Sequence, residues 1–198
     1  MLGNGSTAAP LIMILTIGIS LAGLFKNDRI IDMCLFRPYY FLRGKQYDTI
    51  ILSGFVHADV GHLLFNMFTF FFFAFPMERF LGTIPFLVLY FFGLIVSHGC
   101  TWYKHRNNPG YASLGASGAI SAVLFAFICY FPAAPLYLFL IPVPIPAFLF
   151  AFAYVGYSYW ASMQNTGNIN HDAHLCGALS GVAFVVATDP GAFARWLS

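Results

Sequence analysis

Long apolar stretches alternate with short polar or basic segments along this chain. A transmembrane helix needs about 20 mostly apolar residues, with about 17 as the lower limit. Six stretches approach or reach that length, although three of them are shorter than the limit. They cover residues 8–25, 62–80, 84–98, 115–131, 147–159 and 173–187. We therefore expect an all-α polytopic membrane protein in which a bundle of six helices crosses the bilayer.

Two of the connecting segments have a distinct composition. The segment from Lys26 to Asp48 holds five of the nine Lys and Arg residues, mixed with aromatic side chains, which suits short amphipathic segments at the membrane interface. Five prolines stand between Pro132 and Pro146. Because proline lacks an amide hydrogen and disfavours helix at the preceding residue, we expect Ile141–Pro146 to be an extended connection.

The composition supports a membrane protein and argues against one class of function, nucleic-acid binding. Hydrophobic residues make up 60% of the chain and charged residues only 8%, against about a quarter charged residues in soluble domains. The formal net charge is +2, and the basic residues are scattered rather than gathered in a stripe, which argues against nucleic-acid binding.

We expect one domain over residues 1–198, with the first apolar stretch retained as a span because no basic residue precedes it. The four cysteines form no CxxC pair and are expected to be free thiols.

Polar residues recur where alternate apolar stretches begin. The second, fourth and sixth of six spans begin on the same side of a membrane. His62 and Asn66 lie near the start of the second stretch, Ser117 near the start of the fourth and His174 near the start of the sixth. The parity of the spans therefore predicts that these four residues lie at similar depth on one side.

Ser117 and His174 are candidates for a nucleophile and its base. A serine hydroxyl is a weak nucleophile without a base, and imidazole titrates near neutral pH. Small residues allow membrane helices to approach closely; those beside the two candidates are Gly115, Gly118, Gly177 and Gly181. The alternatives are that the glycines serve general helix packing, that Ser117 bonds to its own helix, and that His174 is structural.

His62 and Asn66 could stabilise a developing oxyanion. Their i, i+4 spacing places them on one face of a helix, and both side chains can donate hydrogen bonds, as can the unpaired amide of Ser117 at a helix start. Each such donor contributes about 3 kcal/mol in a dry site. The alternatives are that Asn66 joins helices and that His62 is merely interfacial.

Two other features of the sequence could suggest a metal site or a third catalytic residue. His57 and His62 have no third ligand at a useful spacing, so we expect no metal and no cofactor. Asp172 stands two residues before His174 and does not share its helix face. It is interpreted as a helix cap or dipole partner rather than as the third member of a triad.

The motifs together resemble the rhomboid family of intramembrane serine proteases, with the six-span core of its bacterial members. The matching segments are His57–Asn66 (HADVGHLLFN), residues 78–82 (ERFLG), residues 115–118 (GASG), and Ala173-His174 followed by Gly177 and Gly181. The resemblance implies a Ser117–His174 dyad without a carboxylate, and an oxyanion hole made of the Ser117 amide, His62 and Asn66. It also implies an embedded first loop, and a gate and cap formed by the fifth span and residues 162–172.

The sequence departs from the family pattern in three respects. Ser121 stands where many members have an aromatic residue that stacks on the histidine, so another group must orient His174. Asp48-Thr49 replace a Trp-Arg pair. Seven of the nine Lys and Arg residues lie on the side of the first loop, which the positive-inside rule would place in the cytoplasm, whereas the family places that loop outside. We adopt the family's orientation.

Our hypothesis is a multi-pass serine endopeptidase that cleaves single-span membrane proteins within or near their transmembrane segment. The first alternative is a catalytically inactive rhomboid-like protein that binds membrane clients; the second is a small transporter or channel, which would need charged residues at mid-span. Transmembrane substrates and the lipid bilayer are the expected partners, and a bacterial source would imply the inner or plasma membrane. The sequence makes no prediction of the oligomeric state.

Overall fold

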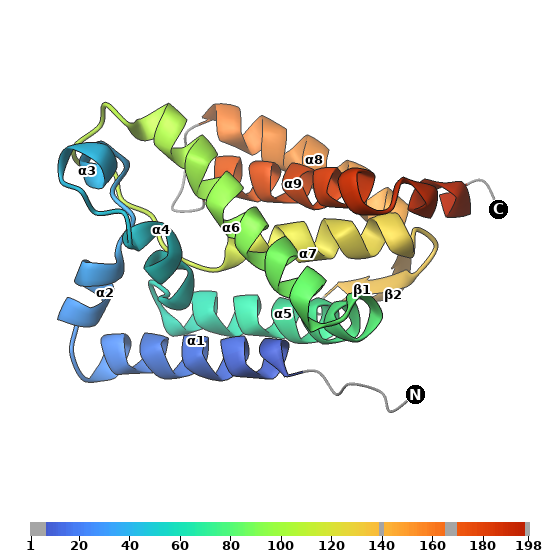
Figure 1. Cartoon of the computed structure of the whole chain (residues 1–198), viewed down its shortest axis with the longest axis horizontal. Helices are drawn as coiled ribbons and strands as arrows, with labels where there is room; N and C mark the ends of the chain where they lie inside the picture. The colour runs from blue at the N-terminus through green and yellow to red at the C-terminus, as the bar shows by residue number, and fades with distance from the viewer. Residues whose placement is uncertain (1–6, 139–140, 165–169, 197–198) are drawn as a thin grey trace.

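Six long helices make up most of the chain (Figure 1). The computed structural model describes residues 7–138, 141–164 and 170–196. The long helices are α1 (Ala8–Phe25), α5 (Val60–Leu81), α6 (Thr83–His105), α7 (Ser117–Tyr130), α8 (Ala147–Gln164) and α9 (His171–Thr188). The predicted all-α polytopic fold is confirmed. By length and composition alone, α1, α5 and α6 are suited to cross a membrane, and α7 is a shorter apolar helix.

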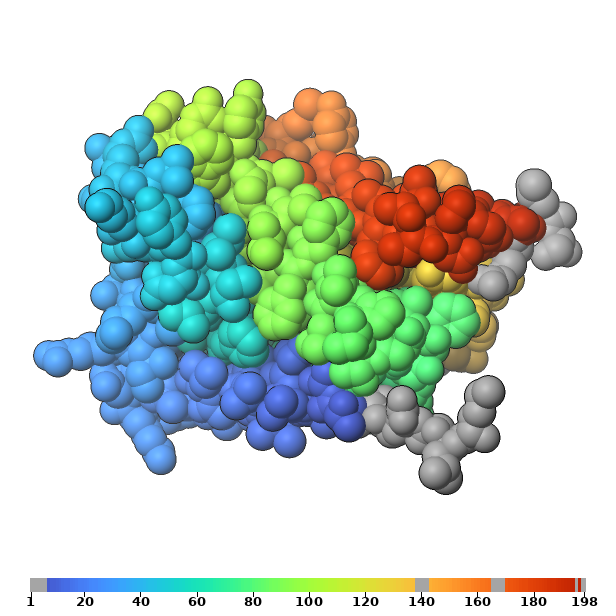
Figure 2. All heavy atoms as spheres, in the orientation of Figure 1, coloured from blue at the N-terminus to red at the C-terminus, as the bar shows by residue number. Residues whose placement is uncertain are grey.

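The segment after α1 folds into short helices. These are α2 (Arg29–Cys34), α3 (Pro38–Arg43), α4 (Thr49–Leu52) and the 3-10 turn η1 (Ser53–Phe55). Pro38 occupies the first turn of α3, where its missing amide hydrogen costs nothing. In the space-filling view these elements form a block beside α6, at one end of the bundle (Figure 2). This matches the short segments expected for Lys26–Asp48.

A hairpin joins α7 to α8 at the opposite end of the bundle (Figure 1). Its strands, β1 (Pro135–Leu138) and β2 (Ile141–Pro146), are antiparallel, with Pro135 opposite Pro146 and Leu136 opposite Ile145. The extended form of β2 agrees with the sequence, whereas its pairing with β1 was not expected. A two-stranded ribbon has free edges on both sides, so it tolerates prolines that a central strand would not. The chain ends, as far as it is described, in the 3-10 segment η2 (Pro190–Trp196).

Alternate helices begin at the same end of the bundle. Figure 1 shows α5, α7 and α9 starting at the end of the bundle nearer the α2–α4 block, while α6 and α8 end at that same end. The core lies between α5, α6 and α7, where Phe70, Leu89 and Tyr90 are almost completely buried. At the other end, the buried carboxylate of Glu78 accepts hydrogen bonds from the backbone amides of Thr7, Ala8 and Ala9, at 2.8–3.0 Å. This carboxylate fixes the start of α1 to α5.

The expectation of four free thiols is wrong. Cys100 on α6 and Cys176 on α9 form a disulfide with their Cα atoms 6.5 Å apart, whereas Cys34 and Cys129 are free. The predicted third span ended at residue 98, whereas α6 continues to His105. This continuation brings Cys100 alongside α9. The hydropathy pattern ended earlier than the helix because polar residues occupy its last turns.

Candidate active site

Ser117 is the first residue of α7, and its position is fixed by the segment that leads into the helix. The backbones of Phe36 and Ser113 exchange two hydrogen bonds of 2.9 and 3.0 Å, and the amide of Gly115 donates to the carbonyl of Ser53 at 2.8 Å. Gly115 has a φ of +110°, a conformation that other residues rarely adopt. Because Ser117 begins the helix, its amide has no acceptor inside the helix. The hydroxyl and a free amide thus lie together at the end of α7.

Helices α7 and α9 touch backbone to backbone. A Cβ atom added at Gly177 would lie 2.1 Å from the carbonyl oxygen of Gly118, and one added at Gly181 would lie 2.1 Å from that of Ala122. A Cβ atom at Gly118 would lie 2.2 Å from the Ser97 hydroxyl of α6. The glycines thus permit separations that any side chain would prevent.

This contact places His174 beside the start of α7. His174 lies one turn before Gly177, and Ser117 directly precedes Gly118, the residue that Gly177 touches. Within the described residues, no hydrogen bond joins the Ser117 hydroxyl to the His174 ring. Such bonds are often long in enzymes without substrate and tighten on binding. The backbone geometry therefore brings the two predicted residues into one small region.

His62 lies against the loop before Ser117. A Cβ atom at Gly115 would lie 2.8 Å from the Cε1 atom and 3.0 Å from the Nε2 atom of His62, so only glycine leaves room for this ring. Asp59 caps α5 by accepting a hydrogen bond from the His62 amide at 2.7 Å. The His62 ring thus lies against the loop that leads into α7.

Asn66 is buried one turn further along α5. Its side-chain amide donates to the carbonyl of His62 at 3.0 Å, which leaves its second N–H and its carbonyl oxygen for other partners. The Asn66 side chain thus bonds back to the turn of α5 that carries His62.

His57 is a fully buried histidine behind His62. Its Nδ1 atom lies 3.0 Å from the hydroxyl of Ser20 on α1, and its ring contacts His62 edge to face with centroids 4.8 Å apart. Burial, together with the neighbouring His62, lowers the pKa of His57 to about 3, so the ring is neutral at physiological pH. In the described ranges no three His, Cys, Asp or Glu side chains are grouped to hold a metal ion. The position of His57 indicates a structural link between α1 and α5.

Tyr154 on α8 stacks on His174 and was missed by the sequence analysis. The two rings are nearly parallel, at 15°, with centroids 6.5 Å apart. The Tyr154 hydroxyl lies 2.7 Å from the hydroxyl of Ser121. Ser121 thus occupies the position where the sequence lacked an aromatic residue, and it binds an aromatic residue supplied by another helix. The one available signal was the matching i, i+3 spacing of Tyr154 and Tyr157 on α8 and of His171 and His174 on α9.

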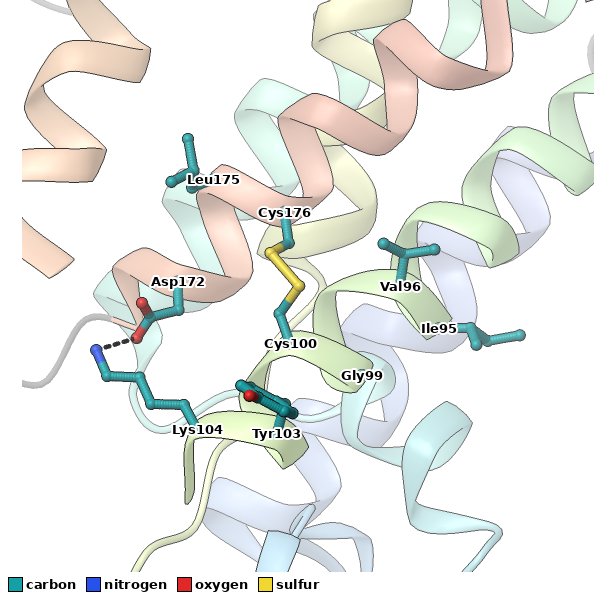
Figure 3. Close-up of a pocket in the computed structure, with 9 residues that line it drawn as sticks. All are labelled: Ile95, Val96, Gly99, Cys100, Tyr103, Lys104, Asp172, Leu175 and Cys176. Atoms are coloured by element: carbon teal, nitrogen blue, oxygen red, sulfur yellow. Dashed lines mark hydrogen bonds and ion pairs between the residues drawn. A yellow bond between two sulfur atoms is a disulfide. The ribbon is translucent and has the colours of Figure 1, made fainter. Parts of the chain in front are cut away.

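Three contacts fasten the start of α9 to α6, and Figure 3 shows two of them, the disulfide and the Lys104–Asp172 ion pair. Besides the disulfide, Lys104 pairs with Asp172 at 2.7 Å, and the Asn170 side chain donates to the Thr101 hydroxyl at 2.9 Å. Asn170, rather than Asp172, caps α9, by accepting a hydrogen bond from the amide of Ala173. Asp172 is therefore not the cap. It stands in the first turn of α9, where a negative charge suits the helix dipole, and it pairs with Lys104. The chain between α8 and Asn170, part of the expected cap, includes residues 165–169, which lie outside the described residues.

Comparison with known proteins settles the family. Residues 44–189, most of the chain, match the family model described as the Rhomboid domain. The chain belongs to the rhomboid family. Among its relatives, rhomboid protein 1, mitochondrial, of Saccharomyces cerevisiae is 32% identical over 75% of this chain and 45% of its own length. RHOMBOID-like protein 12, mitochondrial, of Arabidopsis thaliana is 27% identical over 84% of this chain and 55% of its own.

A third relative is presenilin-associated rhomboid-like protein A, mitochondrial, of Danio rerio, which is 33% identical over 69% of this chain and 36% of its own length. The chain thus spans about half or less of the length of these relatives. The names of all three include the word mitochondrial, so they lend no support to the expected bacterial plasma membrane. The family and the apolar helices establish an integral membrane protein.

Proposed function

We propose that this protein is an intramembrane serine endopeptidase that cleaves single-span membrane proteins with a Ser117–His174 dyad. The observation that carries the proposal is the backbone contact between Gly118 and Gly177, which brings the start of α7 and the first turns of α9 together. A serine at a helix start, close to a histidine one turn from such a contact, supports the assignment of these two residues as nucleophile and base.

The proposed reaction follows the general course of serine proteolysis. The Ser117 Oγ atom attacks the scissile carbonyl carbon while His174 accepts the hydroxyl proton. The tetrahedral intermediate collapses, the C–N bond breaks, and His174 gives the proton to the leaving amine. Water then attacks the acyl-enzyme, again with His174 as the base, and releases the second product together with free Ser117.

The oxyanion is proposed to lie among the Ser117 amide and the side chains of His62 and Asn66. The position of the His62 ring against Gly115, two residues from the nucleophile, supports this assignment. In a dry site each donor lowers the barrier by about 3 kcal/mol. Loss of His62 or Asn66 should therefore weaken the reaction, whereas loss of Ser117 or His174 should abolish it.

The disulfide supports the family's orientation in the membrane. Disulfides persist in oxidising compartments and are rare where thiols are kept reduced. Cys100 and Cys176 lie where α6 ends and α9 begins, the end of the bundle that also holds Ser117. We infer that this end faces the oxidising side, despite the positive charges of the first loop. The names of the relatives favour a mitochondrial membrane.

The test is cleavage of a single-span membrane protein by the purified chain in liposomes. We expect the wild type to cut the substrate in or near its transmembrane segment, and the Ser117→Ala and His174→Ala variants to be inactive with an unchanged thermal unfolding temperature. Equal cleavage by the wild type and the Ser117→Ala variant would refute the dyad. Tight binding of the substrate without cleavage by the wild type would favour the inactive, client-binding alternative.

A further inference from the structure

Tyr154 is fixed at both ends of its side chain. Its ring packs against Phe125 of α7 and Phe150 of α8, with centroids 5.3 and 5.7 Å away. Its hydroxyl bonds to Ser121 at 2.7 Å. A tyrosine held by packing and by a hydrogen bond loses its rotational freedom, so its ring presents a defined surface to His174.

The ring of Tyr154 lies nearly parallel to the His174 imidazole. Nearly parallel rings at 6.5 Å fall within the range in which aromatic pairs attract each other. Both nitrogens of an imidazole lie in the plane of the ring, so a partner on its face restricts rotation without occupying either nitrogen. The stack therefore limits the orientation of the base and leaves it able to exchange protons.

A second pair of rings repeats this contact one turn away. Tyr157 meets His171 edge to face with centroids 5.5 Å apart, and the His171 ring contacts His174 at 6.1 Å. The two tyrosines are spaced i, i+3 on α8, and the two histidines are spaced i, i+3 on α9. The helices α8 and α9 therefore contact each other at two successive turns at the site. The stack on His174 is thus part of an extended contact rather than a single coincidence.

The hydrogen bond to Ser121 connects this contact with the nucleophile. Ser121 lies one helical turn after Ser117 on the same helix. Tyr154 therefore bonds to the helix that carries the nucleophile and stacks on the residue that would act as its base. One side chain thus contacts both the helix of the nucleophile and the ring of the base.

We propose that Tyr154 is a positioning residue for His174 and that Ser121 holds it in place; this inference rests on the proposed function. Because Tyr154 belongs to α8, whereas the dyad belongs to α7 and α9, the base is correctly oriented only while α8 is docked. The docking of α8 is therefore a condition for catalysis, imposed by one side chain.

The test measures the rate at which a fluorophosphonate labels Ser117, because this reaction needs an activated nucleophile but no bound peptide. Tyr154→Leu, which removes the stack, should slow labelling by about 100-fold, as expected for a misplaced base. Tyr154→Phe keeps the ring and should recover most of that loss, remaining within about tenfold of the wild type. Tyr159→Leu is the matched control, because Tyr159 is an exposed tyrosine on the same helix, and it should label at the wild-type rate.

A double-mutant cycle tests the role of Ser121. Ser121→Ala and Tyr154→Phe remove the two partners of one hydrogen bond, so the double variant should label no more slowly than the slower single variant. With a peptide substrate, Tyr154→Leu should lower kcat and leave KM within about twofold. These results would separate a positioning role from a general loss of packing.

Three results would overturn the inference. The first is labelling of Tyr154→Leu at the wild-type rate. The second is a multiplicative effect of Ser121→Ala and Tyr154→Phe, neither of which removes enough packing to unfold the protein. The third is absence of labelling in the wild type, which would refute the proposed function as well; in the first two cases the proposed function stands.

Discussion

Replacing Gly177 by alanine tests the contact on which the site depends. The added Cβ atom would lie 2.1 Å from the oxygen and 2.9 Å from the carbon of the Gly118 carbonyl. Both atoms belong to the backbone and cannot rotate away. An ordinary contact begins near 3.4 Å, so α7 and α9 must separate by about 1 Å in an interior packed as densely as a crystal.

The separation should reduce activity more than stability. A shift of about 1 Å between reacting groups costs about 100-fold in rate, and His174 lies only one turn from Gly177. Overpacking destabilises by about 1–3 kcal/mol, of which the higher helix propensity of alanine offsets about 1 kcal/mol. We expect kcat to fall about 100-fold while the unfolding temperature in detergent falls by only a few degrees.

Two further variants calibrate this experiment. Gly181→Ala makes the same clash with Ala122 but lies one turn further from His174, so it should lower stability equally and activity less than Gly177→Ala. Gly99→Ala is the control, because a Cβ atom there meets nothing within 4 Å, and it should leave activity unchanged. Wild-type cleavage and unfolding temperature in Gly177→Ala would refute the account of the helix contact.

The remaining predictions concern stability. Reducing the Cys100–Cys176 bond, which closes a separation of 76 residues, should destabilise the protein by up to about 4 kcal/mol. Differential scanning calorimetry should then show a lower unfolding temperature than for untreated protein, with Cys34→Ser as an unaffected control; alkylation of both cysteines before reduction would contradict the assignment. The pKa of His57 is about 3 in the folded protein against 6.5 ordinarily, so between these values only the unfolded chain binds this proton. The free energy of unfolding should fall as pH drops below 6.5, by up to about 1.4 kcal/mol per pH unit from this residue, and His57→Gln should flatten that slope in thermal unfolding from pH 7.5 to 4.5. An identical slope in the variant would show that the ring does not stay neutral.

The sequence predicted the positions of the helices better than their contacts. The hydropathy pattern located all six long helices, because a helix that crosses a bilayer must be apolar along its whole length. It ended the third at residue 98, whereas α6 continues to His105, because long polar side chains such as Lys104 can reach the interface from inside a helix. The cysteine pairing was hidden for the same reason, since Cys100 was assigned to a loop.

For the candidate site, the sequence predicted the features that follow from the alternating direction of the spans alone, namely the end of the bundle at which its residues lie. Ser117 and His174 lie at helix starts at one end of the bundle, as alternating spans require. The orientation of His174 was not predictable, because it depends on how α8 is rotated about its axis. Hydropathy carries little information on that rotation when most positions of a helix are apolar. The contact between Tyr154 and His174 was therefore identified from the structure, although Ser121 marks the position where the sequence lacks an aromatic residue.

The most direct test of the central claim is identification of the serine that a fluorophosphonate labels in the membrane-embedded protein. Mass spectrometry of the labelled wild type should find the probe on Ser117, and the His174→Ala variant should remain unlabelled. Labelling of Ser117 at an equal rate without His174, or labelling of a different serine in the wild type, would contradict the account.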